Sequence, residues 1–114
     1  MTISSVFAAG DVVEVEFPYS YEGGAKQRPA LVIMGPNAHG DYTFIMISTQ
    51  QHEDGIPIAA PDFSTGALNA ASFVRTSRLI TINGDHVLTR RGRLKPTAVS
   101  RVLAKLCPTL GCKC

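Results

Sequence analysis

The order of its hydrophobic patterns is the feature that most constrains what this chain can fold into. Short β-forming runs follow one another through the first 82 residues, and helical spacing occurs only near the end. Residues 11–17, DVVEVEF, alternate apolar and acidic side chains, which predicts a strand with one buried face. The chain therefore has to build its core mainly from β-structure.

Further strands are predicted between segments rich in glycine and polar residues. Residues 28–34, RPALVIM, are apolar without alternation, as in a strand buried on both faces. Pro29 is expected at its start, because proline cannot donate to a ladder of hydrogen bonds. Residues 42–48 predict another strand, and 56–58 predict a short edge strand. One or two more are expected within 72–74 and 79–82, followed by a turn at 83–85.

The end of the chain predicts a single helix over residues 97–106. Four apolar residues recur there with helical spacing and share one face: Val99, Val102, Leu103 and Leu106. Pro96 suits the first turn, and the Cys107-Pro108 pair is expected to end the helix. Five or six short strands and one terminal helix predict a mainly β (α+β) fold, a small curled barrel with the helix packed on it. We expect one domain over residues 1–114.

No apolar run approaches the roughly 20 residues that a membrane-spanning helix needs. The first nine residues have neither a basic cluster nor a long apolar stretch, so no signal peptide is expected. These features predict a soluble, cytoplasmic protein.

All the cysteines lie in the last eight residues, at positions 107, 112 and 114. Three thiols without a nearby histidine do not match the four-ligand spacing of a structural zinc site. A disulfide framework is not expected either, because the chain lacks a secretory signal. Residues 107–114 are therefore expected to form a flexible tail with free thiols.

Basic residues are unevenly distributed along the chain. Nine of the eleven Lys and Arg residues lie from Arg75 onward, where Asp85 is the one acid. Such an asymmetry is a hint of a polyanionic partner. The alternative is a C-terminal helix that carries its basic side chains on a solvated face.

Standard catalytic motifs are absent: there is no P-loop, dinucleotide fingerprint, H-E-x-x-H or G-x-S-x-G. The histidines at 39, 52 and 86 are expected on surface turns, with His52 nearest to a polar segment. What remains are polar residues at strand ends, namely Arg28, Ser48, Thr49, Arg75 and Arg78. An arginine that begins a buried strand can simply pair with a carboxylate. It can also bind phosphate, because a guanidinium remains charged and binds phosphate through two N–H groups.

Several motifs in order make the chain resemble the MazF/PemK toxins of toxin–antitoxin modules. They are GDVVEVEFP at 10–18, a glycine loop, RPALVI at 28–33, ISTQ at 47–50, SFVR at 72–75, LITIN at 79–83 and RGRL at 90–94. The resemblance covers residues 10–106, and its most specific part is the opening G-D followed by R-P-x-L-V. It implies an SH3-like barrel, a homodimer, and an antitoxin partner with an acidic, partly disordered segment.

The resemblance also implies an activity, the cleavage of single-stranded RNA without a metal or other cofactor. In that reaction the 2′-hydroxyl of the substrate attacks the adjacent phosphate and leaves a cyclic phosphate. The family pattern places catalytic residues at Arg28, Ser48 and Arg75. RNA contacts are expected from Thr49, Gln50, Ser77, Arg78 and Tyr21, with Tyr19 and Phe17 as further stacking candidates and the basic residues of 90–93 along the RNA backbone.

Two positions depart from the PemK branch of this family. That branch carries an acid where this chain has Ser77, and a histidine in the first loop, where residues 18–27 contain none. A hydroxyl is a poor proton acceptor at neutral pH. Two alternatives therefore remain beside the endoribonuclease: a non-enzymatic, gyrase-binding toxin of the CcdB type and a catalytically silent RNA-binding domain on the same barrel.

Overall fold

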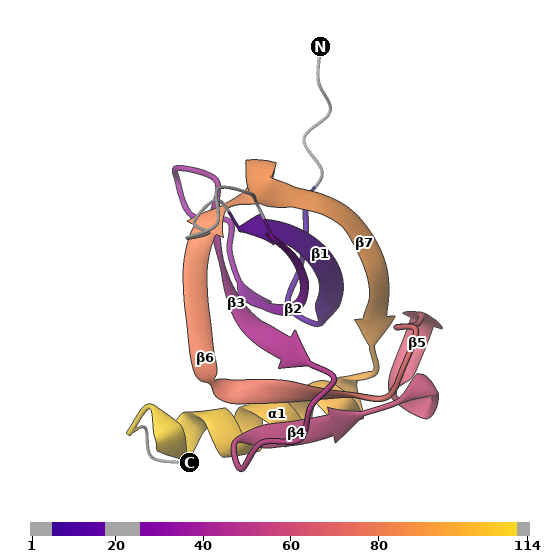
Figure 1. Ribbon diagram of the computed structural model, residues 1–114. Helices are drawn as coiled ribbons and strands as arrows, with labels where there is room; N and C mark the ends of the chain where they lie inside the picture. The colour runs from indigo at the N-terminus through magenta and orange to yellow at the C-terminus, as the bar shows by residue number, and fades with distance from the viewer. Residues whose placement is uncertain (1–5, 18–25, 112–114) are drawn as a thin grey trace.

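The computed structural model describes residues 6–17 and 26–111 (Figure 1). These contain strands β1 (Asp11–Phe17), β2 (Lys26–Met34), β3 (Asp41–Ser48), β4 (Gly55–Ile58), β5 (Phe63–Gly66), β6 (Ser72–Asn83) and β7 (Val87–Leu94). They also contain the 3-10 helices η1 (Ala60–Asp62) and η2 (Gly84–His86) and the α-helix α1 (Pro96–Thr109). All strand pairs are antiparallel, in the order β4-β6-β3-β2-β1-β7-β5. The predicted mainly β, curled, barrel-like fold with a C-terminal helix is confirmed, although the sheet is not closed.

The central strands contribute side chains to two cores, one on each face of the sheet. Val12 and Leu31 belong to the core that includes Val102 of α1. Their neighbours in sequence, Val13 and Val32, belong to the core inside the curled sheet. This confirms that the apolar run in β2 is buried on both faces, since successive residues of a strand point to opposite sides.

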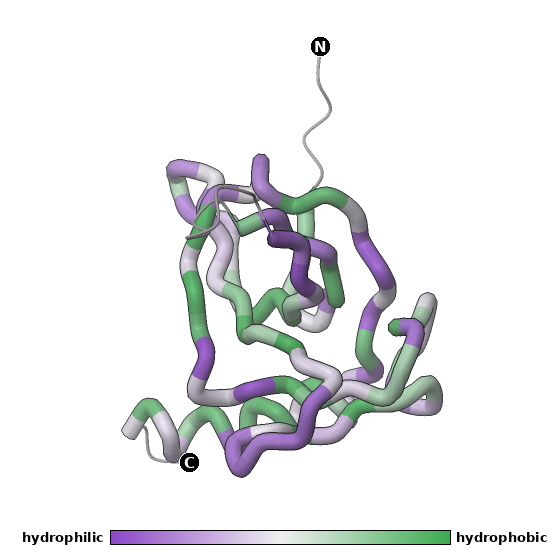
Figure 2. Tube along the Cα trace, in the orientation of Figure 1, coloured by the Kyte–Doolittle hydropathy of each residue, from purple (hydrophilic) through white to green (hydrophobic). Residues whose placement is uncertain are grey.

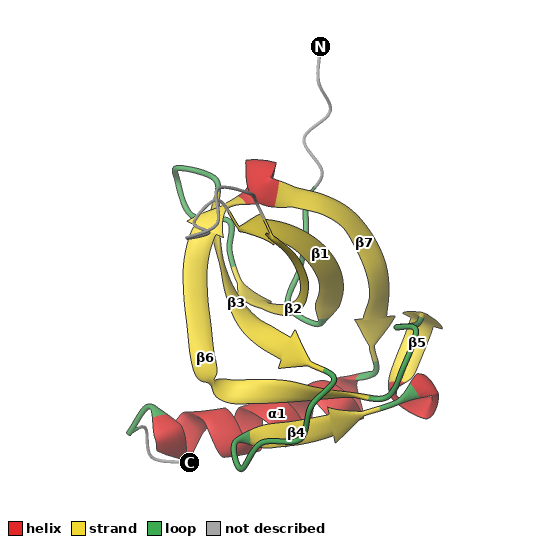
Figure 3. Cartoon of the chain, viewed as in Figure 1, coloured by secondary structure: helices red, strands yellow, loops and turns green. Residues whose placement is uncertain are grey.

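Helix α1 packs on β4 and β6 (Figure 3) and extends further than predicted. It continues through Cys107 and Pro108 to Thr109, so the expected end at residue 107 is wrong. Ala98 is buried with Val102 and Leu106, while Leu103 is 45% exposed, so the buried face is rotated from the predicted one. Cys107 is disulfide-bonded, which corrects the expectation of a free thiol there; Cys112 and Cys114 lie outside the described residues.

Pro29 lies inside β2 rather than at its start, which is a correction to the predicted strand boundary. β2 pairs with β1 from Lys26 onward, but its ladder with β3 begins only at Ala30. The first residues of β2 therefore have a neighbouring strand on one side only. A proline, which has no N–H to donate, is tolerated at such a position.

Strand β6 is bent between the part that pairs with both β3 and β4 and the part that pairs with β3 alone (Figure 1). Ile47 of β3 pairs with Val74, whereas Ile45 pairs with Leu79, so residues 75–78 all lie opposite the single residue Met46. The two segments predicted as one or two strands are therefore one long strand with an irregular corner. Irregularities of this kind bend a strand and are frequent beside functional sites.

The sequence patterns did not predict β5 and β7. In Figure 2, the middle of β7 and the connection between β3 and β4 are strongly hydrophilic, while hydrophobic residues lie at the two ends of β7, on other strands and on the helix. Gly66 ends β5 with φ of +68°, and a Cβ there would clash with the carbonyl oxygen of Arg91 on β7. Within the described part of the chain, no helix has the length and hydrophobicity needed to cross a membrane.

Candidate functional site

Three strands bring the predicted site residues to one groove of about 530 Å³. Its lining consists of Arg28, Pro29, Met46, Ile47, Ser48, Thr49, Gln50, Arg75 and Arg78. Ala30 of β2 pairs with Met46 of β3, so continuing this register by two residues sets Arg28 opposite Ser48. The corner of β6 brings Arg75 and Arg78 beside Met46. The groove thus lies where the β2–β3–β6 ladder ends.

The hydroxyl of Ser48 is oriented by the turn that follows β3. Its Oγ accepts a hydrogen bond from the backbone N–H of Gln50 at 3.0 Å. This contact occupies a lone pair of the oxygen and leaves the hydroxyl hydrogen to donate. A ligand oxygen in the groove, such as that of a phosphate, is a suitable acceptor for that hydrogen.

Two of the three groove arginines differ from the other arginines in their ion pairs. Arginines elsewhere are paired with carboxylates, in the pairs Arg90–Asp11, Arg93–Asp11, Arg91–Glu14 and Arg101–Asp62. Arg28 and Arg78 are exposed and have no ion pair with a described residue. Two guanidinium groups without an ion pair in the described part of the chain favour an anion in this groove, and phosphate matches their hydrogen-bonding geometry.

Arg75 differs from these two because a carboxylate holds it. Its Nε donates to Oδ1 of Asp54 at 3.2 Å. The other oxygen, Oδ2, accepts from the hydroxyl of Ser77 and from its backbone N–H. Hydrogen bonding from the Ser77 hydroxyl, followed by that from its backbone and from Arg75, lowers the pKa of Asp54 to about 2 against the cost of partial burial. The carboxylate is therefore ionised at neutral pH.

Ser77, predicted to contact RNA, does not line the groove; its polar groups bind Asp54. The family resemblance places an acid at position 77. Here that position is a serine, and the carboxylate beside it belongs to Asp54. Sequence reasoning missed Asp54 because it lies 23 residues before Ser77. It also missed Pro29 and Met46, whose apolar side chains gave no signal of a site.

The other predicted site residues that the structure describes do not line the groove. Tyr19 and Tyr21 are outside the described residues. Phe17 is buried in the core inside the sheet, so its predicted role in base stacking is wrong. His52 does not line the groove. The basic residues of 90–93 lie on β7, and none of them lines the groove either.

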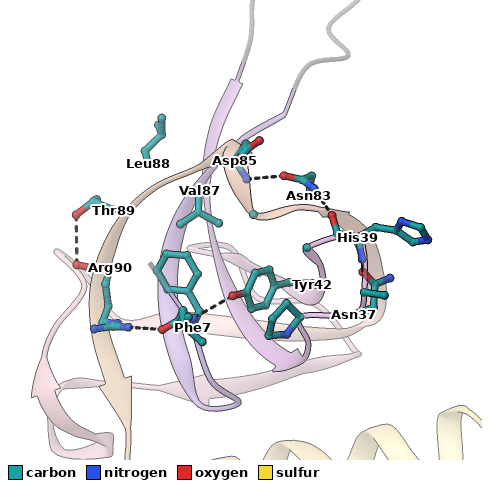
Figure 4. A pocket seen from close by; sticks show the side chains of 15 residues that line it. Phe7, Asn37, His39, Tyr42, Asn83, Asp85, Val87, Leu88, Thr89 and Arg90 are labelled. Atoms are coloured by element: carbon teal, nitrogen blue, oxygen red, sulfur yellow. Dashed lines mark hydrogen bonds between the residues drawn. The ribbon is translucent and has the colours of Figure 1, made fainter. Parts of the chain in front are cut away.

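A larger hollow of about 870 Å³ lies between the N-terminal segment, the 37–40 turn and the start of β7 (Figure 4). Several of its polar groups bind one another. The Tyr42 hydroxyl accepts from the Phe7 backbone N–H, and Asn83 bonds to the His39 carbonyl and the Asp85 N–H. Arg90 lies over the Phe7 ring and donates to a backbone carbonyl. These contacts stabilise the loops, so the smaller groove is the better candidate site.

Known proteins resemble this chain in fold. No curated protein matches this chain significantly in sequence. In structure it is similar to the Mycobacterium tuberculosis toxin MazF-mt6, with a TM-score of 0.72, 16% identity, and 91% of this chain and 99% of that chain covered. MazF from Deinococcus radiodurans matches with a TM-score of 0.72, 19% identity and coverages of 95% and 99%.

A third similar structure is a mycobacterial endoribonuclease in complex with its cognate antitoxin, with a TM-score of 0.68, 16% identity and coverages of 92% and 93%. At these identities the structural matches establish the shared fold. The sequence model of the PemK-like, MazF-like toxins of type II toxin–antitoxin systems matches residues 8–110, nearly the whole chain. By that match, this chain belongs to the PemK-like, MazF-like toxins of type II toxin–antitoxin systems.

Proposed function

We propose that this protein is the toxin of a toxin–antitoxin module and acts as an endoribonuclease on single-stranded RNA. The observation that carries the proposal is the convergence of Arg28, Ser48, Arg75 and Arg78 in one groove. Two of its three arginines have no ion pair with a described residue. Membership of the toxin family supports the same function.

The proposed reaction is an internal transesterification. The 2′-oxygen of the substrate forms a bond to the adjacent phosphorus, and the bond from phosphorus to the 5′-oxygen breaks. The 2′-hydroxyl loses a proton and the 5′-oxygen gains one, so the products are a 2′,3′-cyclic phosphate and a 5′-hydroxyl. The reaction supplies its own nucleophile and requires no metal ion.

Each groove residue has a role in this reaction. Negative charge grows on the phosphate oxygens in the transition state, and a fixed guanidinium stabilises such charge. We assign this role to Arg28, with Arg75 as the second phosphate ligand. Ser48 donates its free hydroxyl hydrogen to the scissile phosphate, and Arg78, Thr49 and Gln50 hold the neighbouring backbone. Bases in a single strand are accessible to the apolar surfaces of Pro29 and Met46.

We also propose an antitoxin as the partner, since a similar mycobacterial endoribonuclease was solved with its cognate antitoxin. An acidic, partly disordered segment would pair with Arg28 and Arg78 and order on binding. It would then compete with RNA for the same groove. We further propose a homodimer that acts in the cytoplasm, where it meets its RNA.

The test is digestion of a labelled single-stranded RNA by the purified protein in EDTA. We expect cleavage with 5′-hydroxyl ends, and none when the nucleotide at the cut carries 2′-deoxy or 2′-O-methyl sugar. Loss of activity on chelation, or cleavage of an all-DNA strand, would contradict the mechanism. Growth arrest without RNA cleavage would support a gyrase-binding toxin instead. Binding without either effect would support a silent RNA-binding domain.

A further inference from the structure

Asp54 is held by three successive residues of β6. Its carboxylate accepts from Arg75 and Ser77, as described above, and its backbone carbonyl accepts from the N–H and hydroxyl of Thr76 at 3.1 and 3.0 Å. Asp54 directly precedes β4, whose first residue, Gly55, pairs with Arg75. The residue is therefore fixed at the corner of β6, beside the groove.

These contacts determine which part of Arg75 faces the groove. The bond to Asp54 uses Nε, the donor nearest the backbone, at 3.2 Å. The two terminal amino groups of the guanidinium have no hydrogen bond with a described residue and remain for a ligand. A planar guanidinium tied at Nε has a defined orientation, and its remaining N–H groups match two phosphate oxygens. Arg28 and Arg78 have no such tie among the described residues, so Arg75 is the groove arginine with a set orientation.

We propose that Asp54 is a positioning residue, which anchors the Arg75 guanidinium so that its free N–H groups meet the scissile phosphate. The inference rests on the proposed function and names a residue that neither the family resemblance nor the groove lining includes. Asp54 acts through Arg75 and does not touch the substrate itself. We assign it no role as a proton acceptor, because both of its carboxylate oxygens already accept hydrogen bonds from Arg75 and Ser77.

A positioning role and a merely local structural role predict different kinetics. Removing a carboxylate beside an RNA-binding groove makes the groove more positive, so electrostatics alone would leave RNA binding unchanged or strengthen it. Losing the orientation of Arg75 would slow the chemical step, since small displacements of catalytic groups are costly. We therefore expect kcat to fall while the Kd of RNA does not rise.

The first experiment compares Asp54→Ala with Asp62→Ala, a matched removal of an aspartate whose arginine partner, Arg101, lies outside the groove. For Asp54→Ala we expect kcat to fall on the order of tenfold or more. The Kd of a 2′-deoxy, non-cleavable RNA should be unchanged or lower. Asp54→Asn retains an acceptor for Nε, so its kcat should fall less than that of Asp54→Ala. Asp62→Ala should retain wild-type kcat. A wild-type kcat in Asp54→Ala would overturn the proposal.

A double-mutant cycle with Arg75→Ala tests whether the effect passes through Arg75. We expect Asp54→Ala to cause no further loss of kcat in the Arg75→Ala background, because the group that it positions is gone. A full additional loss in that background would show that Asp54 acts by itself and would overturn the proposal.

An NMR measurement tests, independently of RNA cleavage, whether Asp54 orders the Arg75 side chain. In the wild-type protein, the Arg75 Nε–Hε group should show a high heteronuclear NOE, and Asp54→Ala should lower it. An equally ordered Nε–Hε group in the variant would overturn the proposal that Asp54 anchors Arg75. If the wild-type protein cleaves no RNA, the proposed function fails, and this measurement still decides whether Asp54 orients Arg75.

Discussion

The arginines of β7 and those of the groove look alike in sequence but have different surroundings. On β7, Arg90 and Arg93 both bind Asp11, at 3.3 and 2.7 Å. The Asp11 side chain is only 2% exposed and also accepts from the Ala8 backbone N–H. In the groove, Arg28 and Arg78 have no carboxylate partner among the described residues.

This difference shows that the number of basic residues does not locate an anion site. The β7 arginines pair with carboxylates on β1, and Arg90 and Arg93 also donate to backbone carbonyls of the N-terminal segment. The two carboxylates of Asp11 and Glu14 offset part of the charge of these three arginines. Arg28 and Arg78 are exposed and have no carboxylate partner among the described residues, so their charge is open to an RNA phosphate. The two groups should therefore separate into residues needed for stability and residues needed for function.

The largest expected effect is on catalysis, from Arg28→Ala. The cleavage rate should fall on the order of 10²–10³-fold, because a donor to the developing charge is removed. Stability in urea should change little, since the side chain is exposed and has no ion pair with a described residue. Arg91→Ala, which removes a β7 arginine paired with Glu14, is the matched control and should keep its cleavage rate. Equal losses of activity in the two variants would erase the distinction between the groups.

The second effect is on stability, from Asp11→Ala. This change removes the buried acceptor of two arginines and of the Ala8 N–H. We expect the free energy of unfolding to fall by about 2 kcal/mol. Urea denaturation measures it, and cleavage per folded molecule should stay at the wild-type level. A catalytic defect with unchanged stability would place the β7 arginines in the functional site.

A smaller effect is expected on the salt dependence of RNA binding, from Arg78→Ala. If Arg78 binds one phosphate of a single strand, its removal should reduce the slope of log K against log salt by about 0.7. Titration of a non-cleavable RNA at several salt concentrations measures this slope. Arg93→Ala should leave it unchanged. The opposite result would mean that RNA lies along β7.

The smallest effect concerns Asp54 and pH. Because its pKa is lowered from 3.8 to about 2 in the folded protein, its contribution to stability is present above about pH 4. That contribution disappears as the pH falls toward 2. Asp54→Asn should be about 1 kcal/mol less stable than wild type at neutral pH. The difference in free energy of unfolding between wild type and this variant, measured by urea titration, should narrow between pH 4 and pH 2. A difference independent of pH would exclude the charge of Asp54 as its cause.

Where local pattern and burial agree, the sequence predicted the structure well. The β1 boundaries, 11–17, are those expected from alternation, and β2 is buried on both faces as its apolar run indicated. The prediction failed for β7, whose TRRGR segment is polar. Arg91 is accommodated there because Glu14 on the neighbouring β1 compensates its charge. No pattern within β7 itself contains that information.

The candidate site, like the fold, has features that the sequence predicts and features that it does not. The sequence determined by itself which strands form, apart from β5 and β7, and that Arg28, Ser48, Arg75 and Arg78 stand at strand ends or interruptions. Only the tertiary structure decided which of these charges are compensated and which are not. The register shift opposite Met46 brings Arg75 and Arg78 to the groove, and Asp54 reaches Arg75 across 21 residues of chain. Strand formation depends on neighbours in sequence, whereas the compensation of a charge depends on neighbours in space.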